Sequence, residues 1–424
     1  MIVIKGGVTA PKGFLAGGVK AGIKKSGRKD LALLYSEAPA VAAASFTTNR
    51  FQASPVKVSK LHIKNKTHQA IIVNSGNANC ANGRIGDKDA VKMTEFICKP
   101  LLLDKKKVLV ASTGIIGHYL PMEKIEAAIP DLIGSLSGTK GDIFAETIMT
   151  TDTVKKESAV KVKLGQKSVT IGGACKGVGM IYPDTKTERH PSTKVQDSPE
   201  QAKRVEGHAT MLCFLSTDAS ITKKMLEASL GESIADSFNM VSVDGNMSTN
   251  DSCFIMANGL AANLKISSRN NDYRKFTEAL KFVASELARK MARDGEGATK
   301  FIEISVVGAK NEKDAKAVAR KISASNLLKC ACFGEDPNWG RVVAAAGSSG
   351  VDFDPDRVDV YLGKMKALSN GQSIKNFDKA KAGKLFKEKN IYIKVDLGSG
   401  KFSARAWTCD FSKEYVEINS EYST

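Results

Sequence analysis

A threonine at position 210 stands where a charged segment meets an apolar one. Asp184–His208 contains ten Asp, Glu, Lys or Arg residues, whereas Met211–Leu215 is apolar. In that place Thr210 is either an ordinary residue at the start of a strand or a nucleophile exposed by cleavage of the Ala209–Thr210 bond. In the second case its free α-amine serves as its own general base, and its hydroxyl attacks an acyl group.

A second candidate site follows a buried strand predicted at Val108–Ala111. Thr113 and Gly114 come soon after this strand and before an amphipathic helix predicted at Pro121–Ile129. A turn at this junction is either purely structural or presents a hydroxyl and a backbone N–H to a developing oxyanion. Thr113 and Gly114 are therefore candidates for an oxyanion hole.

Two further polar residues stand in unusual local sequences. Thr150 begins the hydroxyl-rich run Thr150–Thr153, and Lys176 is the only cation in Gly172–Ile181, which we predict to be a glycine-rich turn. The run lacks the residue order of a phosphate-binding P-loop. Lys176 either reaches a substrate carboxylate or lies on the surface.

Glu296 follows the clearest predicted helix. Apolar residues recur at helical spacing over Tyr273–Arg293, and Asp294–Lys300 comes next. Gly295 is expected to cap the helix. The glycines on both sides of Glu296 would also let the backbone approach a ligand closely.

Composition limits the classes of function. The net charge is +18, but the lysines are dispersed and aromatic residues make up only 6% of the chain, which argues against nucleic-acid binding. The eight cysteines form no C-x-x-C pair and the five histidines show no ligand spacing, so no metal site is expected. No apolar run is long enough to predict a membrane span, and the first residues predict neither a signal peptide nor a transit peptide. A cytoplasmic enzyme is expected.

The rest of the chain alternates predicted strands with a few helices. Its charge and proline content predict that Asp184–His208 is a flexible loop. A second clear helix is predicted at Glu312–Ala324, and Asp336–Arg341 is predicted to be a turn. The other predicted strands are Leu31–Tyr35, Ala40–Phe46, Gln69–Val73, Phe301–Val307, Ile391–Leu397 and Val416–Asn419.

Six short motifs, in this order, resemble those of the glutamate N-acetyltransferase family, also called ornithine acetyltransferase, of arginine biosynthesis. The resemblance extends from Gly17–Val19 to the last residues. The motifs are Ser112–Gly114, Thr150–Thr153, Lys176–Gly177, Ala209–Leu212, Asp294–Lys300 and Asp336–Arg341. The chain departs from the family pattern in inserting Asp184–His208 before Ala209.

The resemblance implies self-cleavage between Ala209 and Thr210. The products would be an α chain of residues 1–209, which carries the flexible insertion 184–208, and a β chain of residues 210–424. They would stay together as an α2β2 heterotetramer. The implied fold is α/β, with β-sheets layered with helices and the two chains interlocked.

The resemblance also implies residue roles. Thr210 would be the nucleophile, and Thr113 and Gly114 would form the oxyanion hole. The implied substrate-binding residues are Thr150, Lys176, Thr210, Glu296, Asn419 and Thr424. The implied reaction moves an acetyl group from N2-acetyl-L-ornithine to L-glutamate through an acetyl-threonine intermediate. No bound cofactor or metal is implied, and use of acetyl-CoA as a co-substrate stays open.

Two other interpretations remain. The same threonine chemistry with water as acceptor would make the protein a self-cleaving amidase or aminopeptidase. A basic binding protein that has lost catalysis would remain a single chain and would bind nucleic acid in a salt-sensitive manner.

Overall fold

The structure is a computed structural model that describes residues 1–188, the backbone of 208–209, and residues 211–420. These residues form two compact units. Unit 1 comprises Met1–Met180, Asp184–Ile234 and Met247–Leu287, and unit 2 comprises Ile181–Pro183, Ala235–Asn246 and Ala288–Thr424. Within the described residues, no helix combines the length and apolar character needed to cross a bilayer.

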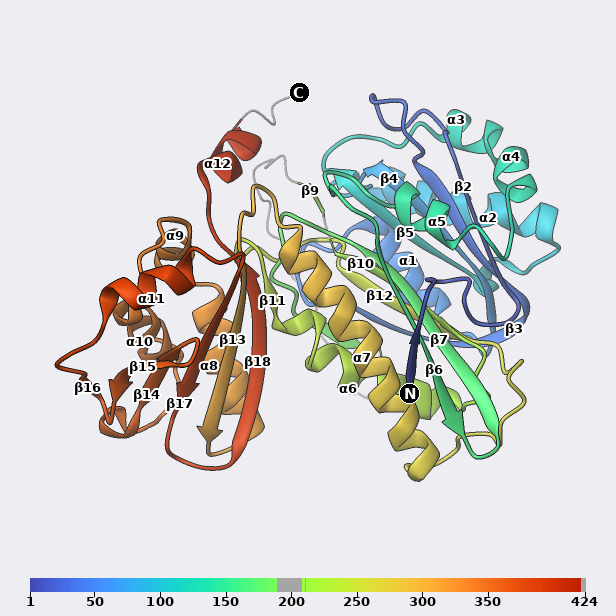
Figure 1. Cartoon of the computed structure of the whole chain (residues 1–424). Helices are drawn as coiled ribbons and strands as arrows, with labels where there is room; N and C mark the ends of the chain where they lie inside the picture. Colours follow the sequence, from blue (N-terminus) through green and yellow to red (C-terminus); the bar gives the residue numbers. More distant parts are fainter. Residues whose placement is uncertain (189–207, 210, 421–424) are drawn as a thin grey trace. The chain divides into compact units, whose positions relative to one another are not determined.

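Unit 1 is built on an 11-stranded sheet, in which the order β1-β6-β7-β10-β12-β3-β4-β5-β9 is joined by β2 and β8, both paired with β3 (Figure 1). The strands are β1 Ile2–Ile4, β2 Phe14–Val19, β3 Leu31–Thr47, β4 His68–Asn77, β5 Val108–Ile115, β6 Lys156–Leu164, β7 Lys167–Lys176, β8 Thr185–Thr187, β9 His208–Ala209, β10 Leu212–Thr217 and β12 Ser252–Ala257.

Both faces of this sheet are buried around β3, β4 and β5. Ala32 and Leu34 belong to one apolar cluster, and Leu31 and Leu33 belong to another. Side chains alternate between the two faces of a strand, so an unbroken apolar run predicts a strand covered on both sides. β4 and β5 pair in parallel, an arrangement typical of strands that are buried on both faces.

Helices supply the covering layers of unit 1. These helices are α1 Ser54–His62, α2 Gly83–Leu101, α3 Met122–Ala127, α4 Ile129–Gly134 and α5 Gly141–Thr147. The helices α6 Lys223–Ala235 and α7 Asn271–Arg293 also begin in unit 1, and their last residues, from Ala235 and Ala288 on, belong to unit 2. One apolar cluster joins α2, α3 and α4 to β3, β4 and β5, and the other places α5 against β2 and β3. The expected α/β fold with sheets layered by helices is confirmed.

The segments on either side of residue 210 share one sheet. β10 and β12 follow this residue in sequence, and they lie between β7 and β3, which precede it. The parallel pair β10–β12 is hydrogen-bonded on one side to β7 and on the other to β3. The two segments are therefore interlocked, as expected. The division into two separate chains stays a prediction.

Unit 2 has a seven-stranded sheet of order β11-β18-β13-β17-β14-β15-β16. Its strands are β11 Val241–Ser242, β13 Phe301–Ala309, β14 Asp359–Leu362, β15 Met365–Ser369, β16 Gln372–Ser373, β17 Asn390–Asp396 and β18 Phe402–Cys409. Its helices are α8 Glu312–Ser323, α9 Asn326–Phe333, α10 Trp339–Gly347, α11 Lys379–Phe386 and α12 Lys413–Ser420. Helix α8 packs on β13 and β18.

Long periodic elements were predicted well, and short ones less so. The helices predicted at Tyr273–Arg293 and Glu312–Ala324 are confirmed as α7 and α8. The strand predicted at Val416–Asn419 is wrong, because α12 covers those residues and the Ser412 hydroxyl accepts a hydrogen bond from the Tyr415 amide at the start of this helix.

Three other expectations need correction. The helix predicted at Pro121–Ile129 is two short helices, because Pro130 lies in the first turn of α4 rather than ending a helix. The turn predicted at Asp336–Arg341 is cut short, because α10 already begins at Trp339. The loop predicted at Asp184–His208 is ordered at both ends as β8 and β9, and residues 189–207 lie outside the described residues.

Candidate functional site

Thr113 and Gly114 lie inside β5 rather than in a turn after it. Thr113 is fully buried, and Gly114 has φ +135°, a conformation that favours glycine. A Cβ atom at Gly114 would lie 2.2 Å from the carbonyl carbon of Gly76 on β4. The predicted turn at Thr113 and Gly114 is wrong, because β5 continues to Ile115 and contains both residues.

The backbone before the predicted cleavage bond runs beside this strand. β9 pairs antiparallel with β5, with Ala209 opposite Gly114 and His208 opposite Ile115. Ala209, whose carbonyl would be attacked in the predicted self-cleavage, and the predicted oxyanion donor Gly114 are therefore neighbours across a strand pair. Thr210 lies outside the described residues.

Lys176 is the last residue of β7 and is fully buried. Its ammonium donates a hydrogen bond of 2.7 Å to the hydroxyl of Thr150 and one of 3.1 Å to that of Thr113. The surface alternative for Lys176 is thus wrong. Three predicted site residues from distant parts of the sequence are in direct contact.

The glycine-rich turn predicted at Gly172–Ile181 is also wrong in its first half. Residues up to Lys176 belong to β7, which is paired on both edges. A Cβ atom at Gly172 would lie 2.0 Å from the carbonyl oxygen of Gly7. The glycine is therefore explained by close packing against another backbone segment, and not by a turn.

Asp152 fixes Thr150 and the end of β7. One carboxylate oxygen accepts from the Lys156 ammonium at 2.6 Å and from the Gly177 amide at 2.8 Å. The other accepts from the Thr150 amide at 3.1 Å. Burial opposes ionisation of Asp152, but the charges of Lys156 and Lys176 lower its pKa to about 2. It is a permanent anion at neutral pH.

A second buried aspartate lies beside Met211, the residue that follows Thr210. The carboxylate of Asp251 accepts a hydrogen bond of 3.1 Å from the Met211 amide. Burial raises the pKa of Asp251 to about 7, although the Met211 amide, Ser248 and the charge of Lys176 each lower it. This group is close to the midpoint of its titration at neutral pH.

Asn250 ties the Asp251 loop to the predicted oxyanion strand. Its side-chain amide donates to the carbonyl oxygen of Ser112 at 2.7 Å and to that of Ala78 at 2.8 Å. Ser112 precedes Thr113 in β5. The loop 248–252 therefore contacts both the strand that carries Thr113 and the residue that follows Thr210.

Two other predicted site residues meet in unit 2. The side-chain amide of Asn419, on α12, donates a hydrogen bond of 3.2 Å to the carboxylate of Glu296. The flanking glycines serve packing within this unit, because a Cβ atom at Gly297 would lie 2.5 Å from the amide nitrogen of Tyr415. Gly297, with φ +65°, takes the left-handed conformation that was expected of Gly295. Thr424 lies outside the described residues.

Asp152, Lys156 and Asp251 were not among the predicted site residues. Asp152 stands inside the hydroxyl-rich run, and its acid–Lys spacing of four residues to Lys156 was the available signal. Asp251 follows a run of polar loop residues. Nothing in its local sequence indicates that it reaches Met211, because that contact joins residues 40 positions apart.

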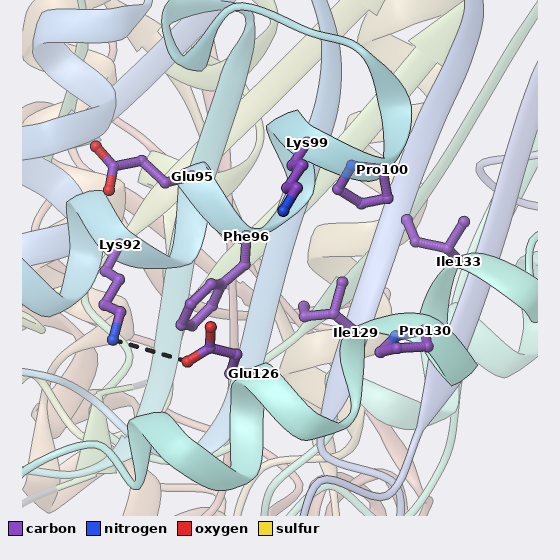
Figure 2. Close-up of a pocket in the computed structure, with 9 residues that line it drawn as sticks. All are labelled: Lys92, Glu95, Phe96, Lys99, Pro100, Glu126, Ile129, Pro130 and Ile133. Atoms are coloured by element: carbon purple, nitrogen blue, oxygen red, sulfur yellow. Dashed lines mark ion pairs between the residues drawn. The ribbon is translucent and has the colours of Figure 1, made fainter.

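A surface groove of about 730 Å³ lies elsewhere on unit 1, between α2 and the pair α3–α4 (Figure 2). Phe96, Ile129 and Ile133 give it an apolar floor, and Lys92 at its rim forms an ion pair of 3.8 Å with Glu126. None of the predicted site residues lines this groove. Among the described residues, no group of three or more His, Cys, Asp and Glu side chains is arranged to hold a metal ion.

Comparisons with known proteins match nearly the whole chain to one family. The ArgJ family model matches residues 15–424. The arginine biosynthesis bifunctional protein ArgJ of Caldanaerobacter subterraneus subsp. tengcongensis is 45% identical over 428 residues, and the match covers all of both chains. That of Geobacillus kaustophilus is 42% identical over 425 residues, covering all of this chain and 97% of the relative. A solved ornithine acetyltransferase from Mycobacterium tuberculosis, in complex with ornithine, is 39% identical with a TM-score of 0.41, and the match covers 43% of this chain and 98% of that one.

Proposed function

Because the chain belongs to the ArgJ family, we propose that it is an acetyltransferase of arginine biosynthesis. It moves the acetyl group of N2-acetyl-L-ornithine to L-glutamate. The observation that carries the chemistry is the position of Gly114, which lies beside Thr113 in β5 and opposite Ala209 in β9. An acyl group presented at the end of β9 would meet the two predicted oxyanion donors.

The proposed nucleophile is the hydroxyl of Thr210, released by self-cleavage after Ala209. Its α-amine, once free, takes the hydroxyl proton as the oxygen attacks the acetyl carbonyl. Ornithine leaves, and the amine of glutamate then attacks the acetyl-threonine ester. The reaction is therefore a ping-pong transfer, in which Thr210 carries the acetyl group between the two substrates.

Lys176 prepares Thr113 for the proposed oxyanion role. An ammonium can only donate hydrogen bonds, so the Thr113 hydroxyl uses a lone pair to accept from Lys176. The positive charge polarises that O–H bond toward a developing oxyanion. Removing one such donor typically costs about 3 kcal/mol of transition-state stabilisation.

The substrate-binding roles of Thr150, Lys176, Glu296, Asn419 and Thr424 remain predictions from the family resemblance. Lys176 is the natural partner for the α-carboxylate that both substrates carry. We further propose an α2β2 assembly, a cytoplasmic location and no bound cofactor. Acetyl-CoA as a second acetyl donor is a matter for direct assay.

The deciding experiment incubates the purified protein with N2-acetyl-L-ornithine, with and without L-glutamate. We expect ornithine and N-acetylglutamate in equal amounts over many turnovers when glutamate is present, and no more than a single turnover of ornithine release without it. Release of acetate at the same rate without glutamate would instead identify the amidase or aminopeptidase. Intact-mass analysis of the same sample should show two chains, one beginning at Thr210.

A further inference from the structure

The residues before and after Thr210 are held by different parts of unit 1. Ala209 is paired with Gly114 of β5. Met211 is held at both backbone groups, since its amide donates to the Asp251 carboxylate at 3.1 Å and its carbonyl accepts from the Ser252 amide at 3.0 Å. The residue before Thr210 is thus paired with the predicted oxyanion strand, and the residue after it is hydrogen-bonded to Asp251.

The Asp251 carboxylate is a buried group with unused hydrogen-bonding capacity. It is fully buried, and its oxygen Oδ1 accepts from the Met211 amide. Its oxygen Oδ2 has no hydrogen-bond partner within the part of the chain that the structure describes. A buried oxygen without a partner costs free energy, so such a group is a candidate for a functional role.

Covalent connectivity brings this carboxylate close to the reacting residue. The Met211 nitrogen that donates to Oδ1 is bonded to the carbonyl carbon of Thr210. One hydrogen bond and one covalent bond therefore separate Asp251 from Thr210. Asn250 meanwhile bonds to Ser112, the residue before Thr113, which keeps the loop beside the predicted oxyanion strand.

The uncleaved chain has a chemical need that the mature enzyme lacks. Before cleavage the nitrogen of Thr210 is an amide, which has no basic lone pair and cannot take the proton of the hydroxyl. Another base has to do so if the hydroxyl is to attack the Ala209 carbonyl. This requirement follows from the proposed function, on which the inference rests.

We propose that Asp251, through Oδ2, is the general base of self-cleavage. It takes the proton of the Thr210 hydroxyl as Oγ attacks the Ala209 carbonyl carbon. It returns that proton to the Thr210 nitrogen as the carbon–nitrogen bond breaks, which leaves an Ala209–Thr210 ester and a free amine. Water then hydrolyses the ester and releases the Ala209 carboxylate and the Thr210 hydroxyl.

The surroundings of Asp251 suit a group that takes and returns a proton. Ser248 and the Met211 amide face it with neutral dipoles, and Lys176 on β7 faces it with a positive charge. Burial outweighs these effects and raises the pKa to about 7. A general base is most effective when its pKa lies near the working pH. Cleavage should therefore accelerate as the pH rises through about 7 and then level off.

The test follows self-cleavage of the full chain by intact mass after rapid purification. Asp251→Asn keeps the size of the side chain but removes the base, and should slow cleavage at least about 100-fold, within the usual range for general-base catalysis. Asp218→Asn is a matched control. Asp218 is also buried and accepts from the amides of Thr170 and Lys12, at 2.7 and 3.3 Å. This control should cleave at the wild-type rate.

A second variant separates proton transfer from a structural role. Asp251→Ala leaves a cavity of the size of a formate ion, so added formate should restore cleavage at least about tenfold, and the larger acetate should restore it less. Cleavage of Asp251→Asn at the wild-type rate would overturn the proposal. So would a failure of formate to rescue Asp251→Ala, or a wild-type rate that does not change between pH 5 and 8.

If the protein were not a self-cleaving acetyltransferase, the same experiments would give a different result. In that case the wild-type chain itself would stay uncleaved at every pH, and no product would form from N2-acetyl-L-ornithine. A wild-type chain that cleaves and transfers acetyl, with an Asp251→Asn variant that does the same, would refute the role of Asp251 alone.

Discussion

Unit 1 buries an aspartate in each of two loops, and both lie within the electrostatic influence of Lys176. In the loop 150–156, Asp152 pairs with the buried ammonium of Lys156 at 2.6 Å. In the loop 248–252, Asp251 accepts its hydrogen bond from the Met211 amide. The pKa of Asp152 is about 2, whereas that of Asp251 is about 7, on opposite sides of their common ordinary value of 3.8.

Burial is nearly complete for both groups, with 3% exposure for Asp152 and 0% for Asp251, so burial does not explain the difference. The partner does. A full positive charge at ion-pair distance more than offsets the desolvation of Asp152, and neutral dipoles do not offset that of Asp251. The first loop therefore holds a fixed anion that positions Thr150. The second holds a group that can exchange a proton near neutral pH.

Replacing Asp152 should have the largest effect on stability of any change at the two aspartates. Asp152→Asn leaves the fully buried Lys156 ammonium without its anion, which should lower the free energy of unfolding by about 3 to 5 kcal/mol. Urea unfolding measures this. The Asp152→Asn variant and the reference protein should both carry Thr210→Ala, so that each remains one chain. The control is Asp142→Asn, which removes an exposed partner of Lys155 and should cost less than about 1 kcal/mol. Equal losses in the two variants would contradict the argument.

The pH dependence of stability should separate the two aspartates. The pKa of Asp251 is raised on folding, so the unfolded chain loses this proton first and stability falls as the pH rises from about 4 to about 7. The full loss is at most about 4 kcal/mol. The pKa of Asp152 is lowered on folding, so its contribution is present above about pH 4 and is lost as the pH falls toward 2.

This pH dependence is measured by urea unfolding in the Thr210→Ala background, with and without Asp251→Asn. The double variant should lack the decline between pH 4 and 7 and should be the more stable protein at pH 7. Parallel curves for the two proteins would mean that the pKa of Asp251 is not raised.

The Thr113 and Thr150 hydroxyls both accept hydrogen bonds from Lys176, and we expect them to differ in their effects on catalysis. Thr113 follows Ser112, which contacts the Asp251 loop, whereas Thr150 is anchored by Asp152. Thr113→Ala should lower kcat about 100-fold with little change in KM, as expected for the loss of an oxyanion donor. Thr150→Ala should mainly raise KM. Steady-state kinetics with N2-acetyl-L-ornithine and glutamate decides this, and reversed effects would exchange the two roles.

The sequence was a good guide where periodicity extends over a long segment. The helix α7 and the buried strands β4 and β5 have apolar patterns that local sequence reveals directly. It failed where tertiary contacts override local preference. Val416 and Ile418 favour a strand, yet α12 covers them because its first turn is capped by Ser412. Pro130 looks like a helix end and is in fact near a helix start.

In the candidate site, too, the sequence does not predict features that depend on tertiary contacts. Short motifs drew attention to Thr113, Thr150 and Lys176, and the structure brings these three together. No local pattern shows that Lys176 is buried, because that depends on pairing of β7 with two other strands. The raised pKa of Asp251 is likewise a property of its surroundings, and the residue type alone predicts an ordinary carboxylate.

Lys176 faces both aspartates, so its replacement should change them unequally. Lys176→Met removes a donor from Thr113 and Thr150 and a positive charge from the neighbourhood of both carboxylates. Asp152 should stay ionised at neutral pH because Lys156 still pairs with it. Asp251 loses the one full charge among the groups that lower its pKa, so that pKa should rise. The pH profile of self-cleavage should then move to a more alkaline midpoint.

The same Lys176→Met variant tests the substrate side of the site. If Lys176 binds the α-carboxylate common to both substrates, KM should rise about tenfold for N2-acetyl-L-ornithine and for glutamate alike, the equivalent of about 1.4 kcal/mol each. Lys155→Met is the control, since Lys155 is an exposed lysine of the same segment as Lys156, paired with Asp142, and should leave both values unchanged. A rise for one substrate alone would mean that the two amino acids do not share a carboxylate site. An unchanged midpoint of self-cleavage would mean that the charge of Lys176 does not act on the base of that step.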